Sequence, residues 1–161
     1  LDGMANYYAH KGKALPGKFQ PGKARYTMGA ILSAIRSSAT PMTLQLDDTE
    51  VQETLLMATI CNGKVEGGDF YLSPDSDLFD GRLELATLSH LSLPKLLLTL
   101  PKFKKGAPPT LSQYNIRSFQ RLTIQSRSPL YVHADGEHLG KSIRNLTLET
   151  VRGKIDLAVL A

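Results

Sequence analysis

Residues 42–63 read MTLQLDDTEVQETLLMATICNG, and this stretch decides the class of fold. In its first part, apolar residues alternate with polar ones, at Met42, Leu44 and Leu46. A period of two is typical of a β-strand with one buried face. Residues 54–61 follow as a largely apolar strand, which Asn62-Gly63 closes. Because both of these residues tolerate positive φ, we expect a type I′ turn there.

Alternating apolar residues continue through most of the chain. They predict further strands at Phe70 and Leu72, Leu83 and Leu85, Leu122 and Ile124, Leu130 to Ala134, Leu146 and Leu148, and Ile155 to Val159. Many short strands with turn residues between them, and no regular βαβ alternation, are typical of packed antiparallel sheets. The predicted fold class is therefore mainly β.

Two segments are predicted to be helices instead. The first has apolar residues at i, i+3, i+4 and i+7, from Met28 to Ile35, and should end by Ala39 because Pro41 disfavours α geometry in the residue before it. The second should run from Leu93 to about Lys104 with Ser92 as its cap, and Pro101 should kink it or end it early. Together with the strands, they predict a β-sandwich with two peripheral helices.

Length, charge and cysteine content limit the classes of function. The 161 residues suit one domain, and no apolar run approaches the roughly 20 residues of a membrane span. A net charge of +4 favours anionic partners but is too small to indicate nucleic acid. The single cysteine, Cys61, fits a cytoplasmic location and is expected to be a buried, inert thiol. Since the first residue is Leu1 rather than Met, we expect a longer polypeptide.

Residues 62–69 read NGKVEGGD, and glycines of this kind can let backbone N–H groups cradle a phosphate. Such a cradle requires a helix N-terminus directly after it, whereas Phe70-Tyr71-Leu72 alternates like a strand. A hairpin with a glycine-rich bulge is therefore the favoured interpretation.

Residues 73–81 read SPDSDLFDG and bring three carboxylates into six residues. A hard cation such as Mg²⁺ or Ca²⁺ takes oxygen ligands of this type. The spacing is not that of an EF-hand, and Asp, Ser, Pro and Gly are also the commonest turn residues. From chemistry alone, a loop without metal is favoured.

Residues 131–137 read YVHADGE. If Leu130, Val132 and Ala134 face the core of the protein, the opposite face of the strand carries Tyr131, His133, Asp135 and Glu137. An aspartate on such a face could accept a proton from an alcohol. The alternative is that Asp135-Gly136 forms a hairpin turn between two strands and that the polar face only meets water. The residues alone favour this alternative.

Taken in order, these segments resemble the C-terminal domain of the bacterial diacylglycerol kinase and sphingosine kinase family. The resemblance covers nearly the whole chain and rests on the order of its motifs, which are Asn62-Gly63, Gly67-Gly68, Pro74-Asp75-Ser76, Phe79-Asp80-Gly81 and Asp135-Gly136-Glu137. It implies that residues 1–161 are the β-sandwich, substrate-side domain of the NAD kinase/diacylglycerol kinase-like fold. The N-terminal domain of that family carries a Gly-Gly-Asp-Gly-Thr motif for ATP, which this chain lacks. The isolated chain is therefore expected to be inactive.

The resemblance also implies roles for individual residues. Asp135 is the candidate general base, and Glu137 is the candidate for orienting it or contacting the nucleotide. Asn62 and Gly63 are the further candidates for cofactor binding. Asp80 matches the second residue of an Asp-Asp-Gly motif associated with Mg²⁺, and Phe79 stands in place of the first. The implied cofactors are ATP and Mg²⁺, both bound mainly through the missing N-terminal domain.

The implied function is ATP-dependent phosphorylation of a lipid hydroxyl, on diacylglycerol or a long-chain base. The expected partners are the N-terminal kinase domain of the same polypeptide and a lipid substrate at a membrane surface, with a homodimer as a further candidate. The expected location is cytoplasmic, with peripheral association at the inner membrane. The alternative is a non-catalytic, regulatory β-sandwich, or one that binds lipid or anionic surfaces through clustered basic residues: Lys11, Lys13, Lys18, Lys23, Arg25, Lys102, Lys104 and Lys105.

Overall fold

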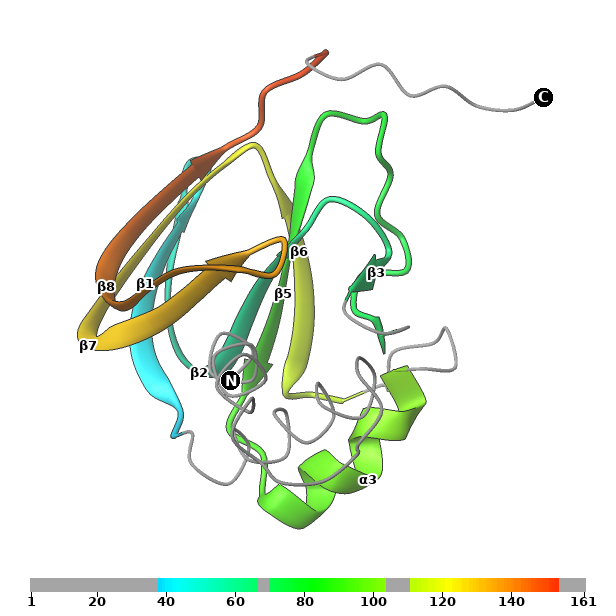
Figure 1. Cartoon of the computed structure of the whole chain (residues 1–161), viewed down its shortest axis with the longest axis vertical. Coiled ribbons are helices and arrows are strands. Elements are labelled where there is room, and N and C mark those ends of the chain that lie inside the picture. Colours follow the sequence, from blue (N-terminus) through cyan, green and yellow to red (C-terminus); the bar gives the residue numbers. More distant parts are fainter. Residues whose placement is uncertain (1–37, 67–69, 104–110, 154–161) are drawn as a thin grey trace, which may run out of the picture.

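The computed structural model describes residues 38–66, 70–103 and 111–153. Within these ranges the chain forms eight strands and one helix (Figure 1). In chain order they are β1 (Thr40–Leu46), β2 (Thr49–Cys61), β3 (Val65–Glu66), β4 (Phe70–Tyr71), β5 (Leu83–Ser89), α3 (Leu93–Phe103), β6 (Tyr114–Phe119), β7 (Arg121–Ala134) and β8 (Glu137–Glu149). The prediction of a mainly β fold is confirmed. The predicted helix from Met28 to Ile35 and the predicted strand from Ile155 to Val159 lie outside the described residues.

Six strands form one antiparallel sheet in the order β6-β5-β2-β1-β7-β8, and β3 and β4 pair separately. Strand β2 turns this sheet into two layers. Its first half, up to Leu55, pairs with β1, and its second half, from Leu55 to Cys61, pairs with β5. A register shift between Leu55 and Met57 marks the bend, as expected where a strand passes from one layer to the next through a bulge. Figure 1 shows β1 and β5 on opposite sides of the bend in β2.

One hydrophobic core fills the space between the two layers. It joins buried side chains of β1 and β7 on one side to those of β5 and β6 on the other, with Leu55 of β2 at the bend. The buried residues of this core are Leu44, Leu46, Leu55, Leu85, Phe119, Leu122 and Ile124. Phe119 and Leu85 are completely buried. At about 25 cal/mol per Å² of apolar surface, such burial is the main term that holds the layers together.

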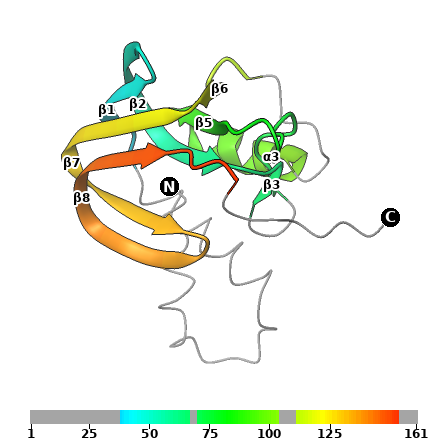
Figure 2. The ribbon, with the colours of Figure 1, turned by 90° about the horizontal axis from the view of Figure 1, so that it is seen from above.

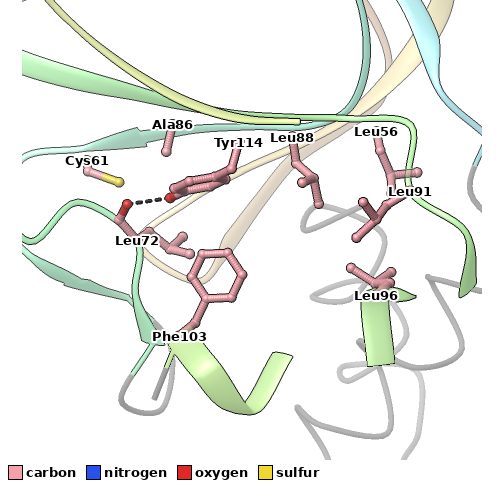
Figure 3. Close-up of a cluster of buried hydrophobic side chains, with 9 residues drawn as sticks. All are labelled: Leu56, Cys61, Leu72, Ala86, Leu88, Leu91, Leu96, Phe103 and Tyr114. Atoms are coloured by element: carbon pink, nitrogen blue, oxygen red, sulfur yellow. Dashed lines mark hydrogen bonds between the residues drawn. The ribbon is translucent and has the colours of Figure 1, made fainter. Parts of the chain in front are cut away.

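A second core lies on the other face of β5, under helix α3 (Figure 3). In β5, Leu85 belongs to the first core, whereas Ala86 and Leu88 belong to the second, as the two-residue period of a strand requires. Leu96 and Phe103 of α3 close this core from outside. The molecule therefore has three layers, and the middle one is buried on both faces.

Tyr114 connects helix α3 to the segment that follows β4. Its ring packs edge-on against Phe103, with ring centroids 5.1 Å apart, and its hydroxyl donates a hydrogen bond to the carbonyl of Leu72 (Figure 3). Burial raises the pKa of the Tyr114 phenol far above its ordinary value. The buried hydroxyl thus satisfies a carbonyl that water cannot reach.

Helix α3 confirms the predicted second helix. The carbonyl of Ser92 accepts the backbone N–H of Leu96 at 2.9 Å, so Ser92 is the N-cap residue directly before α3. Pro101 lies inside α3, which continues to Phe103, so an early end at Pro101 is wrong, whereas the alternative of a kink stays a prediction. Pro101 lies on the exposed side, close to the C-terminal end. There the lost backbone hydrogen bond to Leu97 leaves a carbonyl that water can solvate.

Three further predictions need correction. Strand β6 was not predicted, although Tyr114 and Ile116 alternate in it. Residues 122–124 and 130–134 were assigned to separate strands but belong to one strand, β7. The type I′ turn expected at Asn62-Gly63 is absent, because neither residue has a positive φ. A short link follows β2 there and leads into β3, which does not pair with β2. The buried position predicted for Cys61 is confirmed.

Asp47 fastens the end of the sandwich at which the two layers close. It lies in the two-residue turn between β1 and β2, with φ +48°. Its Oδ1 atom accepts the backbone N–H groups of Gln120 (2.9 Å) and Arg121 (2.8 Å) at the corner between β6 and β7. These two hydrogen bonds, that of Arg121 first, hold the pKa of the Asp47 carboxyl below its usual 3.8, and the Arg82 guanidinium adds to the effect.

We expect Tyr114→Phe to destabilise the protein by about 1 to 2 kcal/mol, because it keeps the ring contact but leaves the buried Leu72 carbonyl without its donor. Denaturant unfolding measures the change. Tyr71→Phe, at a half-buried tyrosine of β4, is the matched control. Equal stability of the Tyr114 and Tyr71 variants would contradict the role given to the hydroxyl.

We expect Asp47→Ala to lower the thermal midpoint more than Asp48→Ala in the same turn. Because the folded pKa of Asp47 is lowered, its contribution to stability is present above pH 3.8 and is lost as the pH falls through the lowered value. The difference between wild type and Asp47→Ala should therefore be largest near neutral pH and shrink in acid. Thermal melts across this range measure it, and a difference that grows in acid would refute the explanation.

Candidate functional site

Strands β7 and β8 form a long hairpin that extends past the edge of the sandwich. Up to Gln125 the hairpin lies against β1, but beyond Ser126 strand β7 pairs with β8 alone. Between Gln125 and Leu130, the four residues 126–129 of β7 oppose the single residue Arg144 of β8. This stretch includes Pro129, which has no N–H to donate. Figure 2 shows the hairpin curving away from β5 and β6 in its outer part. We call this outer part, residues 130–143, the β7–β8 arm.

The tip of this arm is a tight turn at Asp135-Gly136. Ala134 pairs with Glu137, so the loop has two residues, and both have positive φ: +48° at Asp135 and +86° at Gly136. This is the type I′ geometry that Asp-Gly favours. The interpretation that Asp135 shares a strand face with Tyr131, His133 and Glu137 is therefore wrong, and the hairpin turn, which was the alternative, is confirmed. Register shifts on either side of Val132 also break the alternation.

The turn presents two carboxylates to solvent. Asp135 and Glu137 are both exposed, one in the loop and the other as the first residue of β8. His133 and His138 face each other one pair further along the arm. A carboxylate in this turn can be reached from outside, which is one requirement for a group that takes a proton from a bound alcohol.

The loop before β5 uses its acidic residues to shape itself. The Asp77 carboxylate accepts the N–H of Phe79 at 2.9 Å, and the Asp80 carboxylate accepts the N–H of Arg82 at 2.8 Å. Both are turns in which an aspartate bonds to the backbone two residues on. Phe79 between them is 77% exposed.

The Mg²⁺ site implied for Asp80 does not fit these residues. In the part of the chain that the structure describes, no three His, Cys, Asp or Glu side chains are grouped as metal ligands. The neighbouring position holds the apolar ring of Phe79 instead of a second carboxylate. Oxygen donors are what Mg²⁺ requires, so we derive no step through a metal on this loop.

Glu84, at the start of β5, has an altered acidity. Partial burial is the main cause that raises the pKa of its carboxyl, and the nearby negative charges of Asp80 and Asp75 add to the effect. Ser118 and Arg82 act in the opposite direction. The negative potential of the loop from Asp75 to Asp80 therefore extends to the first residues of the middle layer.

Asn62 and Gly63 lie at the end of β2, in an irregular link to β3. Val65 pairs with Tyr71 and Glu66 with Phe70, so the predicted hairpin of this segment is confirmed, with residues 67–69 outside the described ranges. A strand, and not a helix N-terminus, follows the link. These residues therefore do not form a phosphate cradle by themselves.

An open depression, which no sequence motif indicates, lies at the closing end of the sandwich. It has a volume of about 670 Å³ and is lined by Asp47, Asp48, Gly81, Gln120, Arg121, Glu149, Thr150 and Arg152. The Arg152 side chain lines the depression, and its guanidinium donates a hydrogen bond to the backbone carbonyl of Asp80 at 2.9 Å. The depression therefore brings together turns that lie more than 100 positions apart in the chain, and only the fold could reveal it.

The predicted site residues occupy three separate segments of the described structure. Asp135 and Glu137 lie together at the tip of the β7–β8 arm. Asp80 lies in the loop before β5, and Asn62 and Gly63 lie at the end of β2, where Gly63 faces Leu78 of that loop. The arm tip, with two exposed carboxylates, is the strongest candidate for chemistry.

A folded antiparallel sheet with a helix on its middle layer defines this chain as a β-sandwich-like domain. Among protein-family models, residues 1–158 match the one described as the YegS C-terminal NAD kinase beta sandwich-like domain. The chain belongs to that family. The resemblance inferred from the order of the motifs is thereby confirmed, as is the sandwich fold class. Among curated protein sequences, none matches the chain.

Solved structures support the fold. A protein assigned as a diacylglycerol kinase from Bacillus anthracis str. Sterne aligns with a TM-score of 0.63 and 17% identity, over 90% of this chain and 46% of its own. A second structure with the same assignment and source gives a TM-score of 0.58 and 17% identity, over 86% and 50%. A third gives 0.51 and 13%, over 74% and 43%. The chain thus spans about half the length of these proteins.

We expect Gly81→Ala to destabilise the protein by about 1 kcal/mol or more, because Gly81 has φ +68° and a Cβ there would meet the Arg152 guanidinium. Gly63→Ala is the matched control. Gly63 has no positive φ, and a Cβ would meet only a Leu78 methyl at 3.8 Å. Denaturant unfolding compares the two. A Gly63 variant as unstable as the Gly81 variant would refute this distinction.

Proposed function

We propose that this chain is the substrate-side domain of an ATP-dependent lipid kinase. In this proposal the kinase phosphorylates the hydroxyl of a lipid, diacylglycerol or a long-chain base, and the chain is inactive without its N-terminal domain. Membership in the family supports the part of the proposal that makes this chain a domain of a kinase. The observation that carries it to a reaction is the pair of exposed carboxylates, Asp135 and Glu137, at the tip of the β7–β8 arm.

Asp135 is proposed as the general base. As the lipid oxygen forms its bond to the γ-phosphorus of ATP, the bond from that phosphorus to the leaving ADP oxygen breaks, and the Asp135 carboxylate takes the hydroxyl proton. Glu137, two residues away across the turn, is proposed to orient Asp135 or to contact the nucleotide. The rigidity of a two-residue hairpin supports this role, since phosphoryl transfer depends mainly on positioning.

Nucleotide binding is proposed to reside mainly in the N-terminal domain of the same polypeptide. Two observations support this division. The link at Asn62 and Gly63 leads into a strand and not a helix, so it offers no phosphate cradle of its own. The Asp80 loop offers no group of metal ligands among the described residues. ATP and Mg²⁺ would then reach the arm tip from the other side of an interdomain cleft.

The proposed location is cytoplasmic, with peripheral association at the inner membrane. A lipid substrate resides in a bilayer, so its kinase must work at that surface. In the described part of the chain, no helix is long and apolar enough to cross a membrane.

A second candidate function is a regulatory β-sandwich that binds without catalysis. The observation in its favour is Phe79, which is 77% exposed where the family pattern has an acidic residue. A ring presented to solvent in a charged loop suits contact with a partner better than metal binding. The test below separates the two functions.

In the polypeptide that joins this chain to its N-terminal domain, we expect Asp135→Asn to reduce the rate of lipid phosphorylation at least about 100-fold. Asn-Gly favours the type I′ turn as strongly as Asp-Gly does, so the hairpin and the thermal midpoint should be preserved. The measurement is transfer of radiolabelled phosphate from ATP to diacylglycerol and to sphingosine in mixed micelles.

Glu50→Gln, at an exposed carboxylate of β2, is the control for the loss of one negative charge. It should leave the rate unchanged. A folded Asp135→Asn variant with full activity would remove Asp135 as the base. A wild-type polypeptide that transfers no phosphate to any lipid alcohol would favour the regulatory function instead.

A further inference from the structure

Helix α3 carries a second apolar stripe that faces away from the protein. The inner face of the helix, with Leu96, Thr99 and Phe103 buried, packs on the second core. The outer stripe consists of Pro94, Leu97, Leu98 and Pro101, all exposed. Their spacing is i, i+3, i+4 and i+7, so they lie along one side of the helix. Figure 1 shows α3 at the end of the molecule away from the closing turns of the sandwich.

The exposure of this stripe is unusual for leucine. Leu98 is 75% exposed and Leu97 is 40% exposed. A helix that packs on one side of a soluble domain normally carries polar residues on its other side. Exposed apolar residues that occur singly need no explanation, but here two leucines and two prolines are contiguous on one short helix. The stripe therefore has the character of a contact surface.

The charges beside the stripe indicate what it contacts. Lys95 and Lys102 are exposed and flank Leu98 on the same side, one turn before it and one turn after it. The sequence of α3, LPKLLLTLPKF, contains no acidic residue. A helix with apolar residues on its exposed face and lysines at the margin fits an anionic bilayer, because the leucines enter the interface while the lysine head groups stay at the phosphates.

We propose that the outer face of α3 is a docking surface for an anionic lipid bilayer. Leu97 and Leu98 insert at the level of the head groups, and Lys95 and Lys102 contact lipid phosphates. The preference for a bilayer over a protein partner rests in part on the proposed function, which requires a lipid substrate. The surface itself is on α3, on the far side of the middle layer from the first core, and it is separate from the carboxylates of the β7–β8 arm.

The absence of tryptophan from the chain allows a direct test. Leu98→Trp places a single fluorescent reporter in the stripe. With phosphatidylcholine vesicles that contain phosphatidylglycerol, we expect its emission to shift to the blue and to be quenched by brominated acyl chains. Val151→Trp, at a valine after β8 that is 63% exposed, is the matched reporter outside both the stripe and the β7–β8 arm and should show neither effect.

Two further variants test the parts of the surface separately. Leu97→Ser/Leu98→Ser should weaken binding to the same vesicles at least about tenfold in sedimentation assays. Lys95→Glu/Lys102→Glu should weaken binding to vesicles with phosphatidylglycerol and have little effect on the weak binding to pure phosphatidylcholine. All substituted positions are exposed, and circular dichroism confirms that each variant is folded.

Three outcomes would overturn the proposal. The emission of Leu98→Trp could stay unchanged on vesicles, or that of Val151→Trp could shift equally, which would indicate adsorption without a defined surface. Sedimentation equilibrium could show a dimer that Leu97→Ser/Leu98→Ser dissociates, so that a second copy covers the stripe. None of these measurements involves ATP or lipid phosphorylation. If the α3 variants show no defined binding to vesicles, the proposed kinase function is not affected. If the Asp135 test shows no kinase activity, the vesicle measurements still decide whether α3 binds a bilayer.

Discussion

The burial of strand β5 on both of its faces is the constraint on which the rest of the structure depends. Four consecutive residues, from Leu85 to Leu88, are buried, and their side chains enter the two cores in turn. A strand of this kind cannot form the edge of a sheet or face water. It therefore requires β2 and β6 beside it, the layer of β1, β7 and β8 on one face, and helix α3 on the other. The bend in β2 is what allows one continuous sheet to supply two of these layers.

The two layers pack through apolar side chains, but polar contacts hold them together at the end where they meet. The corner between β6 and β7 exposes two backbone N–H groups that no strand partner can take, and the Asp47 carboxylate accepts both. This matters for the candidate site because β7 starts at that corner. The direction in which β7 leaves the corner, and the irregular pairing around Pro129, together determine where the β7–β8 arm points. A turn between two other strands thus helps to place a carboxylate about 90 positions later in the chain.

The sequence predicted what depends on local periodicity and failed where tertiary pairing decides. Alternation located β1, because one buried face imposes a period of two on a strand, and Ser92 as a helix cap located α3. The two turns show the limit. Asn62-Gly63 and Asp135-Gly136 have equal local preference for a type I′ turn, but only the second is flanked by strands that pair with each other. The two strands predicted at residues 122–124 and 130–134 are one strand, β7, because the irregular stretch Arg127-Ser128-Pro129 between them is accommodated as a bulge. The identities of Asp135 and Glu137 followed from resemblance, but their position at an exposed tip did not.

The three-layer arrangement also explains how a fold is kept while identity falls to 17%. The inward positions need only apolar side chains of suitable volume, and many sequences satisfy that requirement. Both of the surfaces to which we assign a role lie on outer layers, the arm tip on one and the outer stripe of α3 on the other. Substitutions there do not disturb β5, so such surfaces can change independently of the core and of each other. Phe79 is an instance: it lies in a loop that Asp77 and Asp80 hold through their own backbone contacts, so the loop keeps its shape with an exposed aromatic ring in it. In this architecture the apolar pattern of the core identifies the fold. The function depends on exposed residues, and each exposed surface has to be tested separately.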